Sequence, residues 1–137
     1  MSFDGSVHLV WGGDRRRFCL GIDELIALQD KRNSGPLEIV TRLQLGMWRV
    51  QDVVETIRIG LLGAYDGAAT PEQDKAVQEL VDRVIRPGRI TESVLVAQAI
   101  LLNALSGDPS DDDRPKKKRR TSSRTKGSPP VSSTKTE

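Results

Sequence analysis

The chain has 137 residues, of which 29% are charged and 36% hydrophobic, a composition typical of a soluble protein with one domain. Residues 1–107 hold 12 Lys and Arg against 14 Asp and Glu, whereas residues 108–137 hold 9 against 5. The single cysteine, Cys19, excludes an intramolecular disulfide framework and favours a reducing cytoplasm. The longest apolar run, from Val94 to Leu105, is shorter than the roughly 20 residues of a membrane span, and we expect no contact with a membrane.

The N-terminal residues predict a β-hairpin. Residues 6–11 alternate as a strand does, with apolar odd-numbered side chains on one face and His8 and Val10 on the other. A second alternating run ends at residues 18–20. The pair Gly12-Gly13 between the two runs suits a tight turn. Because a lone hairpin is only marginally stable in water, one of its faces is expected to lie on helices.

Two short helices are predicted next. Residues 22–32 begin with acidic and end with basic side chains, an order that complements the helix dipole. After a turn, Pro36 is placed at the first position of a second helix, which ends at Gly46.

The stretch from Leu43 to Ala64 is expected to be the centre of the fold. From its middle onward the apolar residues recur with the spacing of one helix face, and we expect that face to point into the core. That face consists of Val50, Val53, Val54, Ile57 and Leu61. The polar residues Gln51, Asp52, Glu55 and Arg58 are expected on the solvent side. Gly60 and Gly63 would permit close packing or end the helix.

Two more helices complete the pattern. Thr70-Pro71-Glu72-Gln73 has the form of a capping box and predicts a helix that ends before Pro87-Gly88. Thr91 is expected to cap the last helix, whose residues are apolar nearly all round. Such a helix is either buried or covered on one face by a partner.

Together these elements predict a mainly α fold with a small N-terminal β-hairpin (α+β). Residues 1–107 are expected to form a compact bundle of about five helices. Residues 108–137 have almost no large apolar side chain, and we expect a disordered basic tail there because nothing offsets the entropy of ordering it.

No combination of residues predicts catalysis. His8 is the only histidine and has no neighbouring nucleophile or second metal ligand, so we interpret it as structural or merely exposed. Cys19 is interpreted as a small hydrophobic residue near the core. Gly12-Gly13 lacks the spaced third glycine of a phosphate-binding loop. We therefore expect a protein that is not an enzyme and has no cofactor and no metal.

Two sets of residues are candidates for binding. The first is a basic cluster that could contact polyanions without sequence preference or act as a nuclear import signal, or could be only a solvated tail. It comprises Lys116, Lys117, Lys118, Arg119 and Arg120. The second is a partner-binding set in which bulky apolar side chains lie at a glycine joint and on the last helix. It comprises Met47, Trp48, Leu95 and Leu102. Met47 and Trp48 are most simply interpreted as core residues, and Trp48 is the first candidate of the two for an interface.

Several segments, in this order, resemble one family. The segments are Trp11-Gly12-Gly13, Leu20 to Leu25, Trp48-Arg49-Val50, Ile57 to Gly63 and Ala99 to Leu105. Over about residues 7–107 the chain is similar to the small tail proteins of gene transfer agents and related siphophages, described as tail tube proteins or as tail assembly chaperones. It departs from them where Ala64-Tyr65-Asp66 replaces further glycines and in the basic tail.

The resemblance implies a non-enzymatic role in tail morphogenesis. The implied protein is a chaperone that coats the tape measure protein, or binds other tail proteins, until the tail tube polymerises. It would be found in the bacterial cytoplasm or on the virion, and self-association is expected. A structural tail tube component is the first alternative. A small nucleic-acid-associated regulator that uses the basic tail is the second, although none of the expected helices is basic.

Overall fold

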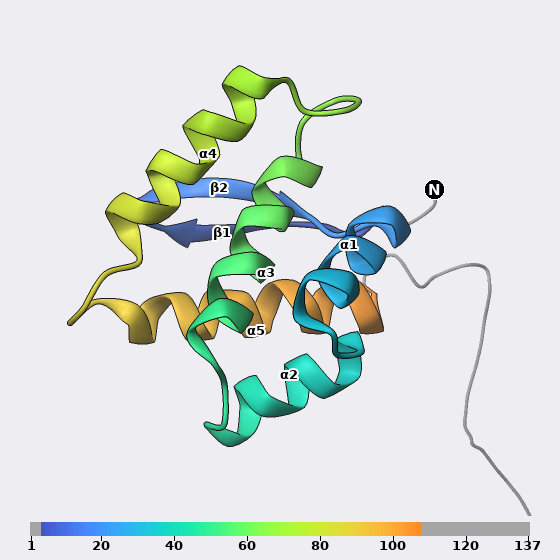
Figure 1. Cartoon of the computed structure of the whole chain (residues 1–137), viewed down its shortest axis with the longest axis vertical. Helices are drawn as coiled ribbons and strands as arrows, with labels where there is room; N and C mark the ends of the chain where they lie inside the picture. Colours follow the sequence, from blue (N-terminus) through green and yellow to red (C-terminus); the bar gives the residue numbers. More distant parts are fainter. Residues whose placement is uncertain (1–3, 108–137) are drawn as a thin grey trace, which may run out of the picture. The chain divides into compact units, whose positions relative to one another are not determined.

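The computed structural model describes residues 4–107, and in this part of the chain one β-hairpin and five α-helices form a single body (Figure 1). The predicted fold class is confirmed. The elements in chain order are β1 (Ser6–Trp11), β2 (Asp14–Cys19), α1 (Ile22–Arg32), α2 (Pro36–Leu45), α3 (Val50–Gly63), α4 (Pro71–Val84) and α5 (Ile90–Ser106).

The hairpin forms as its sequence predicts. β1 and β2 are antiparallel, with Trp11 opposite Asp14 across the turn. Gly12 and Gly13 both have positive φ angles, of 65° and 88°, as the favoured two-residue hairpin turn requires. The inner face is apolar: Trp11 and Phe18 are fully buried and meet edge to face. The Trp11 indole N–H also donates to Ser93 Oγ, at 2.9 Å, and so joins the hairpin to α5.

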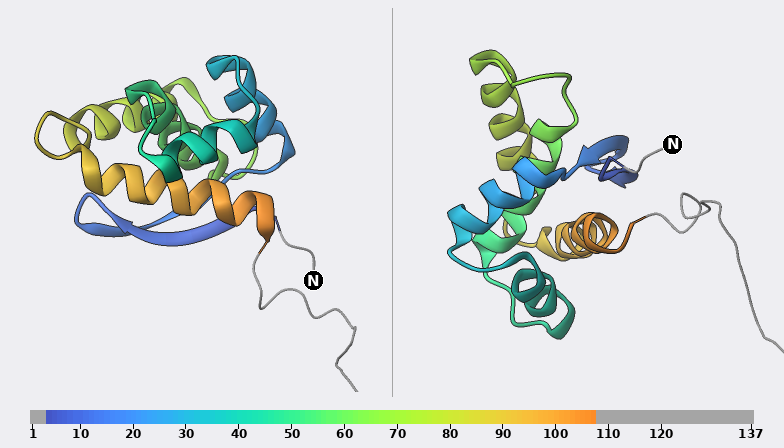
Figure 2. Two further views of the ribbon diagram at one scale, coloured as in Figure 1. Left: turned by 90° about the horizontal axis from the view of Figure 1, so that it is seen from below. Right: turned by 90° about the vertical axis from the view of Figure 1, so that its right-hand side faces the viewer.

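α3 is the central helix. It packs against β2, α1, α4 and α5, and Figure 2 shows these elements arranged around it. Val53 and Ile57 are fully buried, so the predicted apolar stripe does point into the core. The stripe begins later than predicted, however. Val50, the first residue of the helix, is exposed, although Asp52 and Val53 in the same turn are fully buried, so the covered face of α3 turns away from Val50.

The two glycines near the end of α3 allow close packing, as expected. A methyl group at Gly60 would meet Phe18 at 3.5 Å, an ordinary contact. A methyl group at Gly63 would overlap the backbone carbonyl oxygen of Cys19. The backbones of α3 and β2 are therefore closest at Gly63. Cys19 is itself buried, as its interpretation as a hydrophobic residue requires, and its thiol donates to Asp4 O at 3.2 Å.

α4 and α5 begin differently. The predicted capping box of α4 is present: Gln73 N–H donates to Thr70 Oγ1, and Thr70 N–H donates to Gln73 Oε1. The predicted cap of α5 is wrong. The helix already begins at Ile90, which places Thr91 inside its first turn. α5 packs on α3 with its inner face, while α2 and β1 flank it.

We expect Gly63→Ala to lower the free energy of unfolding by about 1–3 kcal/mol, because the new methyl group must push the β2 backbone away. Gly60→Ala is the matched control in the same helix, and it should be neutral or stabilise by up to about 1 kcal/mol through helix propensity. Urea unfolding followed by circular dichroism measures both. Equal behaviour of the two variants would show that α3 and β2 do not approach each other at Gly63.

Candidate surface for partner proteins

A buried carboxylate holds the joint between α2 and α3. Asp52 was expected on the solvent side, but its side chain is fully buried. Its Oδ1 accepts from Arg42 Nη2 at 2.7 Å and from Arg32 Nε at 2.9 Å, and its Oδ2 accepts from Arg42 Nε at 3.0 Å. The Arg49 backbone N–H, at the N-terminus of α3, donates to Oδ2 at 2.8 Å. One carboxylate therefore binds side chains from α1 and α2 and caps α3.

The pKa of Asp52 reflects this competition between burial and hydrogen bonding. Burial by itself would raise the pKa of the carboxyl group, but the hydrogen bonds from Arg42, from the Arg49 N–H and from Arg32 outweigh it. The pKa falls from 3.8 to about 2. The charged form is thus favoured by roughly 2 kcal/mol relative to the unfolded chain at neutral pH.

The joint held by Asp52 presents apolar side chains to solvent. Gly46 ends α2 with a φ of 76°, which turns the chain outward. Met47 is 66% exposed, and Leu45 and Val50 on either side of it are 67% and 53% exposed. Trp48 is half-buried and packs against the core. The two predicted residues of the joint therefore differ: Met47 is exposed to solvent, whereas Trp48 is half-buried against the core.

The outer face of α5 is a second apolar area. Its exposed and half-exposed positions recur every three or four residues, which defines one stripe of the helix. Leu95 is 63% exposed, Leu102 is half-buried, and Leu105 is exposed at the C-terminal end. Glu92, in the first turn, is the only charged residue of α5. The two predicted residues of this helix thus share one largely uncharged stripe.

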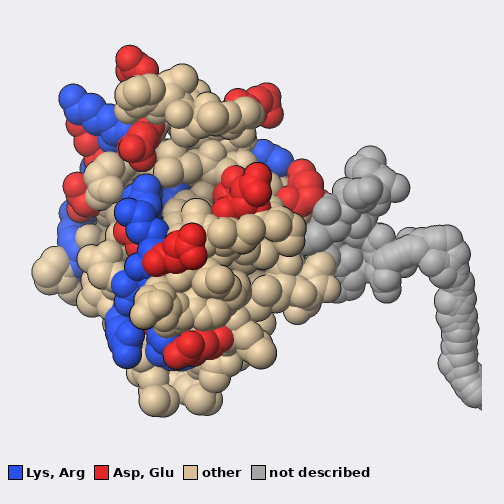
Figure 3. Space-filling model, turned by 45° about the vertical axis from the view of Figure 1, so that its right-hand side comes forward, with Lys and Arg blue, Asp and Glu red and all other residues tan. Residues whose placement is uncertain are grey.

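The structure brings the two areas onto neighbouring elements, because α2 packs along α5. We call the joint residues Leu45, Met47, Trp48 and Val50, together with Leu95 and Leu102, the apolar surface. In Figure 3, uncharged side chains cover most of the lower part of the body, at the height where Figure 1 shows α2 and α5. Exposed apolar side chains that lie together are typical of protein interaction sites, so these six residues are the candidate surface.

The remaining candidates give no site. Lys116 to Arg120 lie outside the described residues. His8 is exposed on the outer face of β1. Within residues 4–107, no cluster of histidine, cysteine and carboxylate side chains is arranged to hold a metal ion. The same residues include no helix that is long and apolar enough to span a membrane.

Sequence reasoning missed Leu45, Val50 and the role of Asp52. Leu45 lies off the face of α2 that buries Ile39 and Leu43, so helical spacing could have identified it. Asp52 stands three residues after the N-cap, a position typical of a capping carboxylate, and this signal was available. Its arginine partners were not predictable, because they come from two other helices.

The described body is therefore a small, mainly helical module with exposed apolar side chains at the joint and on α5. A comparison with protein families places it among tail proteins. The family model described as "Phage tail tube protein, GTA-gp10" matches residues 4–107. No curated protein and no solved structure matches the chain. The chain belongs to this family of phage and gene transfer agent tail proteins, whose description is that of a structural tail protein and not of an enzyme.

Asp52→Asn should lower the free energy of unfolding at pH 7 by about 3 kcal/mol, because Arg32 loses its charged partner in a largely buried place and Arg42 keeps only the exposed Glu38. The pH dependence gives a second readout. The folded-state pKa of Asp52 is depressed, so its contribution is complete above about pH 4 and is lost as the pH falls towards 2.

The Asp52→Asn protein should lack the loss of stability that Asp52 causes in the wild type as the pH falls from about 4 towards 2. Urea unfolding at several pH values measures this difference. Asp66→Asn, in the exposed loop after α3, is the control, and it should change stability by less than about 0.5 kcal/mol. An Asp52→Asn protein as stable as the control would mean that the ion cluster does not hold the joint.

Proposed function

We propose that the protein is a tail assembly chaperone whose apolar surface binds a helical segment of the tape measure protein before the tail tube forms. Membership of the tail protein family supports the general role. The observation that carries the finer proposal is the exposure of Met47, in the joint after α2, and of Leu95, on α5, against which α2 packs. An apolar surface of this kind suits the apolar face of an amphipathic helix.

The local chemistry supports a helical occupant over a small ligand. The outer stripe of α5 runs along a helix of 17 residues, which is about 25 Å long, and has one charge at one end. Ligand pockets are concave, whereas this stripe is the convex face of a helix flanked by α2. A long apolar contact line favours another helix lying along it.

A structural tail tube component is the second candidate, and the description of the family as a tail tube protein favours it. A tube subunit would pair the apolar surface with a different face of the next copy, since a ring needs repeated contacts between different faces of identical subunits. The chaperone and the tube component differ in whether this protein remains in the finished particle.

Met47→Glu combined with Leu95→Glu should weaken binding to tape measure segments at least about tenfold per substitution, because each buried apolar side chain contributes about 1.5–3 kcal/mol. Co-expression followed by pull-down, and calorimetry on the purified proteins, measure the loss. Val10→Glu is the matched control, since Val10 is equally exposed but lies on the outer face of the hairpin.

The control should bind as the wild type does, and all variants should keep their helical circular dichroism signal. Trp48→Ala is less informative, because Trp48 also packs against the core. Undiminished binding by the double variant, or failure of the wild type to bind any tape measure segment, would contradict the proposal.

A count of this protein in purified particles separates the two candidates. A chaperone should be absent from finished tails or present in a few copies, whereas a tube component should be present in a number comparable with the repeats of the tube. Quantitative mass spectrometry of purified particles gives the number. A copy number that scales with tail length would replace the chaperone with the tube component.

The nucleic-acid-associated regulator rests on Lys116 to Arg120, which lie outside the described residues. If these residues only contact polyanions, binding to unrelated DNA sequences should be equal and should weaken steeply between low and physiological salt. Filter binding at several salt concentrations tests it. Sequence-selective binding that persists at high salt would favour a regulator over a tail protein.

A further inference from the structure

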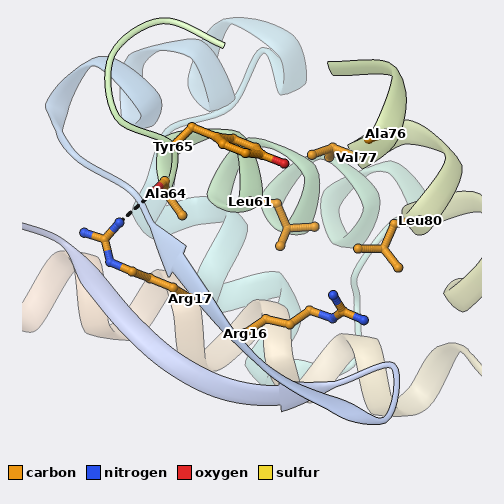
Figure 4. Close-up of a pocket in the computed structure, with 8 residues that line it drawn as sticks. All are labelled: Arg16, Arg17, Leu61, Ala64, Tyr65, Ala76, Val77 and Leu80. Carbon is orange, nitrogen blue, oxygen red and sulfur yellow. Dashed lines mark hydrogen bonds between the residues drawn. The ribbon is translucent and has the colours of Figure 1, made fainter. Parts of the chain in front are cut away.

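A small pocket opens at the edge of β2, away from the apolar surface. Arg16 and Arg17 both line it, as do Leu61 of α3 and Val77 and Leu80 of α4 (Figure 4). Neighbouring residues of a strand point to opposite faces. A pocket lined by two such neighbours must therefore lie at the edge of the strand and not on either face.

Backbone N–H and C=O groups point outward at this edge of β2. In an antiparallel pair, residues alternate between those bonded across the pair and those whose N–H and C=O groups point outward. Ser6 belongs to the outward set, because its carbonyl oxygen accepts from Asn103 of α5 at 3.1 Å. Ser6 pairs with Cys19, so two-residue alternation places Arg15 and Arg17 of β2 in the same outward set.

The two edges of the hairpin differ. The β1 edge is covered, since α5 packs along β1 and bonds to Ser6. β2 has α3 beneath it, and α4 approaches the hairpin at the turn, where Val84 lies against Gly12. No hydrogen bond within the described residues is made by the outward backbone groups of Arg15 and Arg17. An open strand edge of this kind can pair with another extended chain.

The pocket is sized for a side chain. Its volume is about 230 Å³, below the roughly 300–1,000 Å³ of pockets that hold a small ligand. The walls are Leu61, Val77 and Leu80, and Figure 4 shows the Tyr65 ring running along its rim. One or two aliphatic side chains of an added strand would fill it.

The arginines of β2 indicate which side chains an added strand would carry on its solvent face, opposite the face that enters the pocket. β2 carries three consecutive arginines. Arg16 pairs with Asp14, and Arg17 pairs with Asp4 and donates to Ala64 O at 2.8 Å, whereas Arg15 is exposed and has no ion-pair partner among the described residues. The positive charge of Arg15 favours carboxylates on the solvent face of an incoming strand.

We propose that the open edge of β2 binds an extended segment of a partner protein in which apolar and acidic residues alternate. The segment adds a third strand to the hairpin. Its backbone bonds to the outward groups of Arg15 and Arg17, its apolar side chains enter the pocket between α3 and α4, and its carboxylates face Arg15. This site is separate from the apolar surface and does not depend on the chaperone proposal.

Amide hydrogen exchange on the full-length protein tests the proposal residue by residue. In the free protein, the Arg15 and Arg17 amides should exchange much faster than the Arg16 and Phe18 amides, which bond to β1. The probe is the acetylated and amidated peptide Glu-Val-Glu-Leu-Glu-Val-Glu. It should slow the Arg15 and Arg17 amides at least about tenfold at saturation. The same peptide with lysine in place of glutamate should not. Contacts of the probe with the basic residues 114–126 do not affect this readout.

Two variants test separately how the charge of Arg15 and the pocket contribute to binding of the probe. Arg15→Glu should weaken the effect of the probe about tenfold, and Arg89→Glu, an exposed arginine in the turn before α5, is its control. Ala76→Phe, which fills the pocket from an exposed position on α4, should also weaken it, whereas Ala68→Phe in the loop before α4 should not. Slow exchange of Arg15 and Arg17 without the probe, or equal slowing by the lysine peptide, would overturn the proposal.

Discussion

The ion cluster at Asp52 is the interaction on which the arrangement of the first three helices depends. α2 has few contacts with α1 and α3 and packs mainly against α5, so the carboxylate supplies the specific link among the three. A buried ion cluster adds little net stability, because desolvation offsets most of the attraction, but the loss of one member is costly. We infer that the cluster excludes other orientations of α2 rather than strengthening the core.

That orientation is what makes the apolar surface. If α2 lay differently, the exposed Leu45 and Met47 at its end would take another position relative to α5. A tail protein must meet its partners while remaining folded and dissolved. The proposed apolar surface combines exposed apolar side chains of the joint and of α5 with charged groups elsewhere on the body, and Figure 3 shows charged and uncharged side chains on one face.

The two proposed surfaces have different chemistry. The apolar surface offers side chains to a helix, while the β2 edge offers backbone groups and a positive charge to an extended segment. A protein with both could engage two segments at once. In that case each contact would raise the effective concentration of the other, so that two weak contacts would give firm binding.

Local sequence determined much of the fold. Glycine and proline positions, the Thr70 capping box and the spacing of apolar residues predicted every helix and the hairpin within residues 4–107, because each of these signals acts over a few residues. The same signals gave Met47 and Leu95 as candidates. They also gave two wrong assignments on one helix, in which Val50 was expected in the core and Asp52 in solvent.

Only the tertiary structure could decide those two positions. Periodicity tells which side chains share a helix face, but it does not tell which part of that face the neighbouring elements cover, and so Val50 is exposed while Asp52 and Val53 in the same turn are buried. Asp52 is buried because arginines from α1 and α2 meet it, at distances along the chain of 20 and 10 residues. The open edge of β2 depends likewise on where α4 and α5 pack. The sequence by itself determined the elements and their apolar faces, and their packing decided which polar groups are buried and which surfaces remain for partners.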